Sequence, residues 1–500
     1  MGSLREFEPA ESDVLDTAEA GGLIARGGAL RIIGFVATVV LSLAGVVVLT
    51  RYLEPDRFGQ YQTVASLMVV VAAVTDVGMA TLGVREYAQR RDSDRYEFMR
   101  MLLGLRLALS VIGVAGGLLF TAAAGYPTPL VFGTCLAGLG LILTVVQTTL
   151  AIPLGVELRY GVLATMDVTR QALTTALIVA LVLAGAGVAP LLGVTVPVQL
   201  FLIAWTFLLV RGKISARATF RPSVWKSLLG TTVAFALATA VGAVYTYLAQ
   251  ILTSLVATEF QTGVFSAAFR VYTVAAGATS ILVATAFPLL SRAARDDHER
   301  LGYALGRLTQ TTLIAGGAIS IGTFLAAAPI IDIVGGPQYA ASVPVLKILS
   351  FGMLAGFAIA SWGYGLLALH EHRAMIYANL AALGVTGVLV LVLAQSPLGA
   401  RGTAIGALCG EIVLGIGYAI GLSRAPADVT LLSREGLRAM GAIALSLVVG
   451  LLCPVPAIAQ AVIGLGVYLG LLAVLRVVPG EAVDLLPEKI GRRIPRAILS

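Results

Sequence analysis

Charged side chains are scarce in this chain of 500 residues. Asp, Glu, Lys and Arg make up 12% of it, against the roughly 25% that is typical of soluble domains. Apolar residues make up 58%, so a soluble fold would not have enough polar surface to face water. This shortage of charge excludes disordered, collagen-like and soluble globular proteins. It predicts an integral membrane protein.

Cysteine and histidine are also rare, and their positions exclude several kinds of site. Cys135, Cys409 and Cys453 are scattered through apolar runs, so they form neither a metal cluster nor a disulfide framework. The sequence HEH at 370–372 lacks the i, i+4 spacing of a helical zinc motif. No catalytic triad or glycine-rich phosphate loop is visible. We therefore expect neither a metal, nor a cofactor, nor enzyme activity.

Long apolar runs recur along almost the whole sequence. Each has about the 20 residues with which a helix spans a bilayer. Backbone groups in lipid must be hydrogen-bonded within their own segment, so continuous runs indicate helices, whereas barrel strands would alternate. The predicted fold is all-α, with fourteen transmembrane helices. The runs lie at 30–52, 61–84, 102–124, 129–152, 167–187, 190–210, 228–255, 262–290, 308–334, 342–369, 374–396, 400–422, 437–456 and 459–478.

Basic residues are distributed unevenly around these runs. The net charge is +7, with 34 Lys and Arg residues. If the helices alternate in direction, nearly all of these residues fall on one side, and only Arg51, Arg57 and Arg401 fall on the other. Because cytoplasmic loops are enriched in Lys and Arg, both termini are predicted to be cytoplasmic, in a multi-pass protein of the plasma membrane. The basic residues form no patch with interleaved aromatics, so nucleic-acid binding is not expected.

Two stretches of the sequence indicate an internal repeat. The first run ends with LT and continues, after a polar turn, as GQYQTVA from Gly59; the seventh passes LT and continues, after a similar turn, as GVFSAAF from Gly263. Chance similarity of apolar segments is the alternative. Six helices in each half make the repeat parallel. The predicted units are a cytoplasmic polar tail at 1–28, an N-terminal lobe of helices 1–6 at 29–211, a cytoplasmic basic linker at 212–227, a C-terminal lobe of helices 7–12 at 228–423, helices 13 and 14 at 424–478, and a cytoplasmic basic tail at 479–500.

The chain resembles a known transporter family. LTRYLEPDRFGQYQTVASL at 49–67 and DVGMATLGVREYAQR at 76–90 are similar to the start of the polysaccharide or O-antigen-type flippases, within the multidrug/oligosaccharidyl-lipid/polysaccharide exporter (MOP) superfamily. GVFSAAFRVYTV at 263–274, ATAFPLLSR at 284–292 and GTAIGALCGEIV at 402–413 match further stretches in order. The resemblance implies a V-shaped bundle of two six-helix lobes around a central cavity, plus two C-terminal helices. It also implies transfer of a polyprenyl-pyrophosphate-linked oligosaccharide to the outer leaflet.

The seventh run departs from the pattern of this family. Many relatives carry an Arg and an Asp near its end, where this chain reads VYTYLAQILTSL at 244–255 and Gln250 is the only strongly polar residue. The acidic residue that is common a few positions after Arg270 is also absent. Ion coupling through those acidic residues is therefore not implied for this chain.

Ionisable residues inside the runs are the main candidates for a site, because each is costly in lipid. Arg270 lies about 12 Å into its run at 1.5 Å per residue and suits a phosphate; a structural ion pair is the alternative. Arg31 and Arg170 lie about one turn inside the cytoplasmic boundary and either anchor the topology or form the mouth of a positive cavity. Asp76 and Glu411 are candidates for ion coupling or for structural roles, Glu411 as a partner of Arg270 or of another base.

Aromatic residues in mid-span complete the predicted site. Their faces suit sugar rings, although packing within the bundle explains each one equally well. The predicted substrate cavity contains Arg31, Arg170, Arg270, Gln250, Tyr247, Tyr272 and Trp362, with Asp76 and Glu411 as candidate ion-coupling residues.

These features together predict a flippase that works by alternating access on a polyprenyl-pyrophosphate-linked glycan. Anionic membrane lipids are expected at the basic segments 85–106 and 211–227. A polysaccharide polymerase or glycosyltransferases are candidate protein partners. The alternatives are a drug/cation antiporter of the same superfamily, a lipid II flippase, and a membrane scaffold for polysaccharide assembly that transports nothing.

Overall fold

The computed structural model describes residues 18–76, 78–90, 92–157, 159–211, 218–220, 222–296, 298–425 and 433–477. These residues form helices joined by turns and contain no strand element. The helices are α1 (Ala18–Tyr52), α2 (Pro55–Asp76), α3 (Met79–Gln89), α4 (Asp92–Ala123), α5 (Thr128–Leu150), α6 (Ile152–Val156), α7 (Tyr160–Leu183), α8 (Val188–Leu192), α9 (Thr195–Val210), α10 (Pro222–Val256), α11 (Glu259–Asp296), α12 (His298–Leu325), α13 (Ala327–Gly335), η2 (Pro337–Tyr339), α14 (Ser342–Ala368), α15 (His372–Leu393), α16 (Ala400–Ser423), α17 (Arg434–Leu452) and α18 (Ala457–Val474).

The predicted all-α membrane fold is confirmed. Within the described residues, eleven helices are long and apolar enough to cross a bilayer. Helices α1, α10 and α11 are 35, 35 and 38 residues long, and parts of α1 and α10 form the shorter apolar segments Val36–Tyr52 and Ala240–Val256. Each predicted run overlaps at least one of these helices.

Three predicted runs are each divided between two helices. The run at 61–84 contains the end of α2 and the start of α3, and Gly78 between them has a φ of 69°. Glycine adopts this left-handed conformation without the penalty that a Cβ would add. The runs at 190–210 and 308–334 are divided in the same way, between α8 and α9 and between α12 and α13. Hydropathy does not detect such breaks, because the residues on both sides are apolar.

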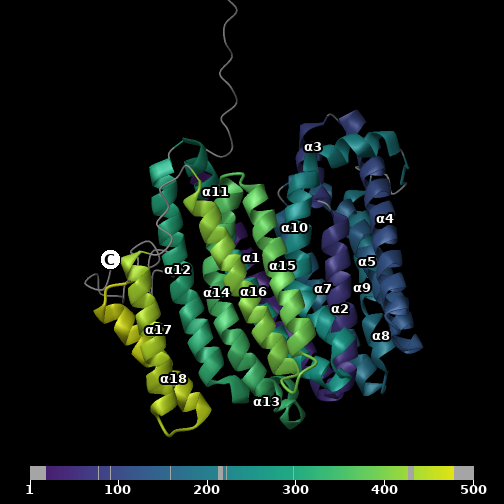
Figure 1. Cartoon of the computed structure of the whole chain (residues 1–500). Coiled ribbons are helices and arrows are strands. Elements are labelled where there is room, and N and C mark those ends of the chain that lie inside the picture. Colours follow the sequence, from purple (N-terminus) through teal and green to yellow (C-terminus); the bar gives the residue numbers. More distant parts are fainter. Residues whose placement is uncertain are drawn as a thin grey trace, which may run out of the picture.

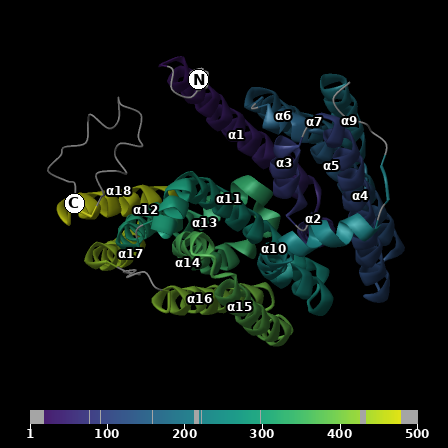
Figure 2. The same ribbon diagram turned by 90° about the horizontal axis from the view of Figure 1, so that it is seen from above.

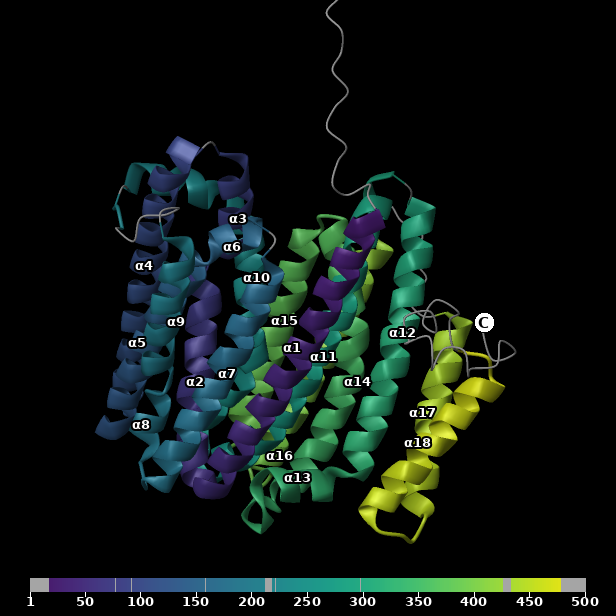
Figure 3. The same ribbon diagram turned by 180° about the vertical axis from the view of Figure 1, so that it is seen from behind.

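The long helices run side by side between two ends of the bundle (Figures 1 and 3). We call them the α3 end, which carries α3 and α6, and the α13 end, which carries α13 and η2. Helices α1–α9 form the N-terminal group and α10–α16 the C-terminal group. Seen along the bundle, α4 and α5 lie at one edge and α17 and α18 at the opposite edge, with α2, α10 and α11 between them (Figure 2). Helices α17 and α18 pack on α12, where Tyr468 donates to the carbonyl of Ile314 at 3.0 Å.

The two glycines that mark the repeat meet where α2 crosses α11. A Cβ on Gly59 would lie 2.8 Å from the backbone nitrogen of Gly263, and a Cβ on Gly263 would overlap the carbonyl of Pro55. The helices are therefore in direct backbone contact, which only glycine at these positions permits. Equivalent positions of the two halves form the crossing between the two groups.

Hydrogen bonds between the two groups are concentrated at the α13 end. One further bond between the groups lies deeper, at Arg270. Toward the α3 end, the backbone of Thr219, just before α10, donates to the carbonyl of Arg100 on α4 at 2.9 Å. The bonds at the α13 end join Thr50 to the carbonyl of Val334, Arg51 to the carbonyl of Ile333 (3.3 Å), Gln338 to the carbonyl of Thr50 (3.1 Å), Tyr339 to the carbonyl of Leu53 (2.9 Å), Gln60 to Glu259 (2.7 Å) and Tyr126 to Ser254 (2.7 Å).

Candidate functional site

A polar cavity of about 180 Å³ lies between the two groups. We call it the Arg270 pocket. Its lining comes from α1, α2 and α7 of the N-terminal group and from α10 and α11 of the C-terminal group. The pocket therefore lies where a movement of one group against the other would change its shape. Its polar residues are Ser42, Tyr61, Gln62, Ser66, Gln171, Thr174, Tyr247, Arg270 and Thr273.

Arg270 is the cation of this pocket. Helix α11 begins at Glu259, which places Arg270 about 17 Å along the helix at 1.5 Å per residue. Its guanidinium donates to Ser42 Oγ at 3.1 Å, and its Nε has no partner. Arg270 also forms no ion pair within the described residues. The structural-pair alternative is therefore not observed, and the guanidinium keeps donors free for an anion.

A second, larger cavity of about 590 Å³ lies within the C-terminal group. We call it the C-terminal cavity; its lining comes from α10, α11, α14, α15 and α16. Glu411 lies on its wall and accepts a hydrogen bond from the hydroxyl of Tyr272 at 2.8 Å. Tyr245 faces the same carboxyl group, and Asn379 donates to the hydroxyl of Tyr418 at 2.9 Å. The cavity therefore presents a carboxyl group among tyrosines.

Arg270 and Glu411 do not meet. Arg270 and Tyr272 are two positions apart on α11, about 200° around the helix axis, so they face opposite sides. Arg270 lines its own pocket, and Tyr272 lines the C-terminal cavity with Glu411. The alternative in which Glu411 neutralises Arg270 is therefore not observed. Helix α11 separates a cationic cavity from an acidic one.

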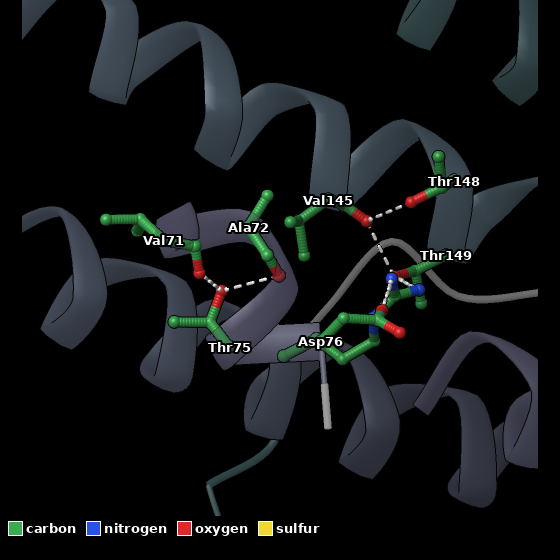
Figure 4. Close-up of polar contacts among 8 residues, drawn as sticks. Val71, Ala72, Thr75, Asp76, Val145, Thr148 and Thr149 are labelled. Atoms are coloured by element: carbon green, nitrogen blue, oxygen red, sulfur yellow. Dashed lines mark hydrogen bonds and ion pairs between the residues drawn. The ribbon is translucent and has the colours of Figure 1, made fainter. Parts of the chain in front are cut away.

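Asp76 is held in an ion pair inside the N-terminal group (Figure 4). Arg106 Nη2 lies 2.7 Å from Asp76 Oδ1, and Arg106 Nη1 donates to Thr149 Oγ1 at 2.9 Å. The side chain of Arg106 is 5% exposed and that of Asp76 is 36% exposed. Asp76 thus joins the end of α2 to α4, and Arg106 continues the contact to α5. This geometry fits a structural role.

Sequence reasoning missed Arg106, which was counted among the topological charges. The predicted run begins at residue 102, but α4 begins at Asp92, so Arg106 lies about 21 Å along the helix. Its apolar neighbours in LLGLRLAL were the available signal. Tyr245, Asn379 and Tyr418 were also missed, because the sequence does not show which faces of helices far apart in the chain come together.

The remaining predicted site residues are dispersed. Arg170 donates to Asp167 and to Gln147 Oε1, each at 3.0 Å, and lies about 15 Å along α7. Gln250 is buried and accepts from Ser266 Oγ at 3.1 Å. Neither residue lines the cavities described above.

Trp362 and Arg31 complete the set. Trp362 packs among apolar residues of α14 and α16 and also lies outside the cavity linings. The side chain of Arg31 lies outside the described residues. Of the predicted cavity residues, Arg270 and Tyr247 are therefore brought together in the Arg270 pocket, while Tyr272 joins Glu411 in the C-terminal cavity.

Comparison with solved structures defines the fold class as that of the MOP superfamily. The lipid II flippase MurJ in an inward closed conformation is 13% identical, with a TM-score of 0.74 over 89% of this chain and 98% of that one. A multidrug resistance MATE family transporter of the MOP superfamily, in an inward-facing conformation, is 15% identical, with a TM-score of 0.58 over 79% of this chain and 98% of that one. The predicted resemblance to this superfamily is confirmed at the level of the fold.

A family model gives the narrower assignment. The model described as "polysaccharide biosynthesis protein" matches residues 48–344, more than half of the chain. The chain belongs to this family. No curated protein sequence matches it. With its apolar helices, the family and the fold identify a multi-pass membrane protein built like the flippases and transporters of this superfamily.

Proposed function

We propose that this protein is a flippase that moves a polyprenyl-pyrophosphate-linked oligosaccharide from the inner to the outer leaflet. The observation that carries the proposal is Arg270, a cation with free donors in a cavity between two groups of helices. Membership of the polysaccharide biosynthesis protein family supports a glycan cargo. The fold shared with a lipid II flippase supports transfer across a bilayer.

In this proposal, Arg270 binds the pyrophosphate. A guanidinium offers several N–H donors in a fork that matches phosphate oxygens, and its charge is worth more away from bulk water. A pocket of about 180 Å³ receives the headgroup rather than the whole glycan. Gln62, Gln171 and Tyr247 on the same walls provide hydrogen-bonding and aromatic contacts for the first sugar. No covalent step is required, so the protein acts as a transporter and not as an enzyme.

The hydrogen bonds between the groups at the α13 end support an alternating-access mechanism. In this proposal the cargo enters from the α3 end and leaves after the bonds at the α13 end have broken. The predicted lobes, 29–211 and 228–423, move as the two units. The basic residues near the α3 end, including Arg85 and Arg90, support a cytoplasmic position for this end.

The complete topology is also a proposal. Helices α1, α10 and α11 add three spans to the eleven that the described residues support. Fourteen spans return the chain to the side on which it started. Both termini are then cytoplasmic, and the anionic inner leaflet attracts the basic segments at 85–106 and 211–227. A polymerase or glycosyltransferases remain candidate partners.

The other predicted site residues receive different roles. Arg170, Gln250 and Trp362 hold helices together in this proposal, and Arg31 stays the candidate for the cytoplasmic mouth that the sequence predicts. Asp76 stabilises the N-terminal group through Arg106. Glu411 is the better candidate for ion coupling, because its hydrogen-bond partner is a phenol and not a cation.

Transport by the reconstituted protein tests the proposal. The assay follows a fluorescent polyprenyl-pyrophosphate oligosaccharide across liposome membranes containing wild type, Arg270→Ala or Arg401→Ala. Arg401 is an exposed arginine near the α13 end, at the start of α16, and serves as the matched control. We expect Arg270→Ala to slow transfer by about tenfold or more, with Arg401→Ala unchanged. Equal transfer by wild type and Arg270→Ala would contradict the proposal.

A further inference from the structure

We propose that the C-terminal cavity binds a monovalent organic cation, with Glu411 as its counter-ion. The ligand class is a quaternary ammonium, a phosphonium or a flat aromatic cation. This site is separate from the Arg270 pocket and does not depend on the proposed glycan transport.

Charge is the first argument. Glu411 lies in the middle of α16, and its carboxyl group accepts a hydrogen bond from Tyr272. No lysine or arginine lines the cavity, and Glu411 forms no ion pair within the described residues. A carboxylate that is removed from water without a cation is unfavourable by several kcal/mol. The site therefore favours an incoming positive charge.

Size and surface are the second argument. A volume of about 590 Å³ falls within the roughly 300–1,000 Å³ of small-molecule sites and greatly exceeds the space that a proton or a bare metal ion occupies. Aromatic rings attract organic cations through their faces, and an aromatic cage with one carboxylate is the arrangement that this chemistry requires. The aromatic residues of the lining are Tyr245, Tyr272, Phe357, Tyr364 and Tyr418.

The backbone of α14 is adapted to these rings. A Cβ on Gly363 would lie 3.0 Å from Cε2 of Tyr418, which is closer than a ring normally permits. Glycine at position 363 thus leaves room for the ring of Tyr418 against this helix. The cavity is formed by matched residues on α11, α14 and α16.

The position of the cavity avoids the repulsion that Arg270 would cause. Arg270 lies on the opposite face of α11, in a separate pocket. The cavity extends from Glu411 to Leu367 and Met375, which flank the turn between α14 and α15 at the α3 end. A cation can therefore approach from that end without passing Arg270.

Binding is expected to depend on pH through Glu411. When the carboxyl group is protonated, an incoming cation releases that proton to solvent, so affinity rises with pH by up to about tenfold per unit. The other titratable groups that face the cavity are phenols, Tyr245 on α10, Tyr272 on α11, Tyr364 on α14 and Tyr418 on α16. Helix α15 contributes the neutral Asn379, and Thr386 lies beside the carboxyl group.

Equilibrium binding of tetraphenylphosphonium to the purified full-length protein tests this site. We expect saturable binding by wild type, a loss of about tenfold or more in affinity in Glu411→Gln, and no loss in Glu299→Gln. Glu299 is an exposed glutamate on α12, so the control makes the same chemical change outside the cavity. The affinity of wild type should rise between about pH 5 and about pH 8, and that of Glu411→Gln should not.

Two further variants and a neutral competitor test the same site in other ways. Ala360→Phe fills the cavity from α14 without changing Glu411, and it should also abolish binding. This variant tests the cavity independently if Glu411→Gln does not fold. Neutral triphenylphosphine should not compete. Equal binding by wild type and Glu411→Gln would overturn the proposal. Binding of only sodium or protons at Glu411, with no tetraphenylphosphonium bound, would also overturn it. Arg270→Ala should bind the probe normally, so failure of the flippase proposal leaves this result unaffected.

Discussion

The Arg270 pocket and the C-terminal cavity lie on opposite sides of α11 and have opposite chemistry. The first is cationic, about 180 Å³ in volume, and shared between the N- and C-terminal groups. The second is acidic, about 590 Å³ in volume, and lies within the C-terminal group. A helix can serve both because residues two positions apart, such as Arg270 and Tyr272, point in opposite directions. A residue's depth in a span therefore does not identify the cavity that it serves.

A substitution at the α2–α11 crossing should have the largest effect on one cavity and not on the other. Gly263→Leu places a side chain where the carbonyl of Pro55 lies, so α2 must move away from α11. Because α2 lines only the Arg270 pocket, we expect glycan transport to be lost while tetraphenylphosphonium binding remains. Transport and probe binding are measured on the same preparation. Gly441→Leu is the control, since a Cβ there meets nothing within 4 Å; transport by Gly263→Leu at the control rate would contradict direct backbone contact at the crossing.

A conservative substitution of Arg270 tests whether the two cavities are independent. Arg270→Lys keeps a positive charge but removes the fork of donors. We expect it to lower glycan transport by several-fold, less than Arg270→Ala does, and to leave probe binding unchanged. Glycan transport and tetraphenylphosphonium binding are measured for Arg270→Lys and Arg270→Ala. If probe affinity in either variant changes as much as transport does, the cavities are coupled and the division by α11 fails.

The Asp76–Arg106 pair lies outside both cavities and should affect stability without affecting selectivity. Asp76→Asn leaves the nearly buried Arg106 without its counter-charge. We expect a loss of about 2 kcal/mol, because Asp76 is partly exposed and full burial would cost more. Thermal unfolding of the purified protein measures this change as a lower Tm.

The matched control for that change is Glu86→Gln. Glu86 pairs with Arg90 at 3.0 Å, and Arg90 is 31% exposed where Arg106 is 5% exposed, so this ion pair contributes about 0.5 kcal/mol or less. Similar Tm values for the two variants would show that Asp76 does not stabilise the N-terminal group.

Ser42→Ala should have the smallest effect. It removes one hydrogen bond to Arg270 and keeps the charge of the pocket, so about 1 kcal/mol, or roughly fivefold in glycan affinity, is expected. The apparent KM for the glycan in the transport assay measures this effect. A loss as large as that of Arg270→Ala would assign the main role to Ser42.

Much of the fold could be predicted from the sequence, because lipid permits few arrangements of the backbone. Each apolar run overlaps a helix, and the two stretches aligned as a repeat begin at Gly59 and Gly263, which meet in the structure. Their contact was not predictable, since the repeat says nothing about which helices cross. The division at Gly78 was missed because glycine breaks a helix without lowering its hydropathy.

The site was harder to predict than the fold. Intramembrane charge drew attention to Arg270 and Glu411, which the structure places in two different cavities, but their relation depends on how α10, α11 and α16 rotate about their axes. Arg106 was missed because hydropathy placed the start of the run too late, so a buried arginine was counted as a cytoplasmic one. A single sequence indicates helix faces and depths. Which residues contact each other across helices depends on how the helices pack.

Direct binding of the lipid-linked glycan tests the central claim, that Arg270 holds the pyrophosphate. Purified wild type, Arg270→Ala and Glu411→Gln are each titrated with a polyprenyl-pyrophosphate oligosaccharide and with the same glycan lacking the pyrophosphate. The account predicts that wild type and Glu411→Gln prefer the pyrophosphate form and that Arg270→Ala loses this preference. Retention of the full preference by Arg270→Ala would contradict it.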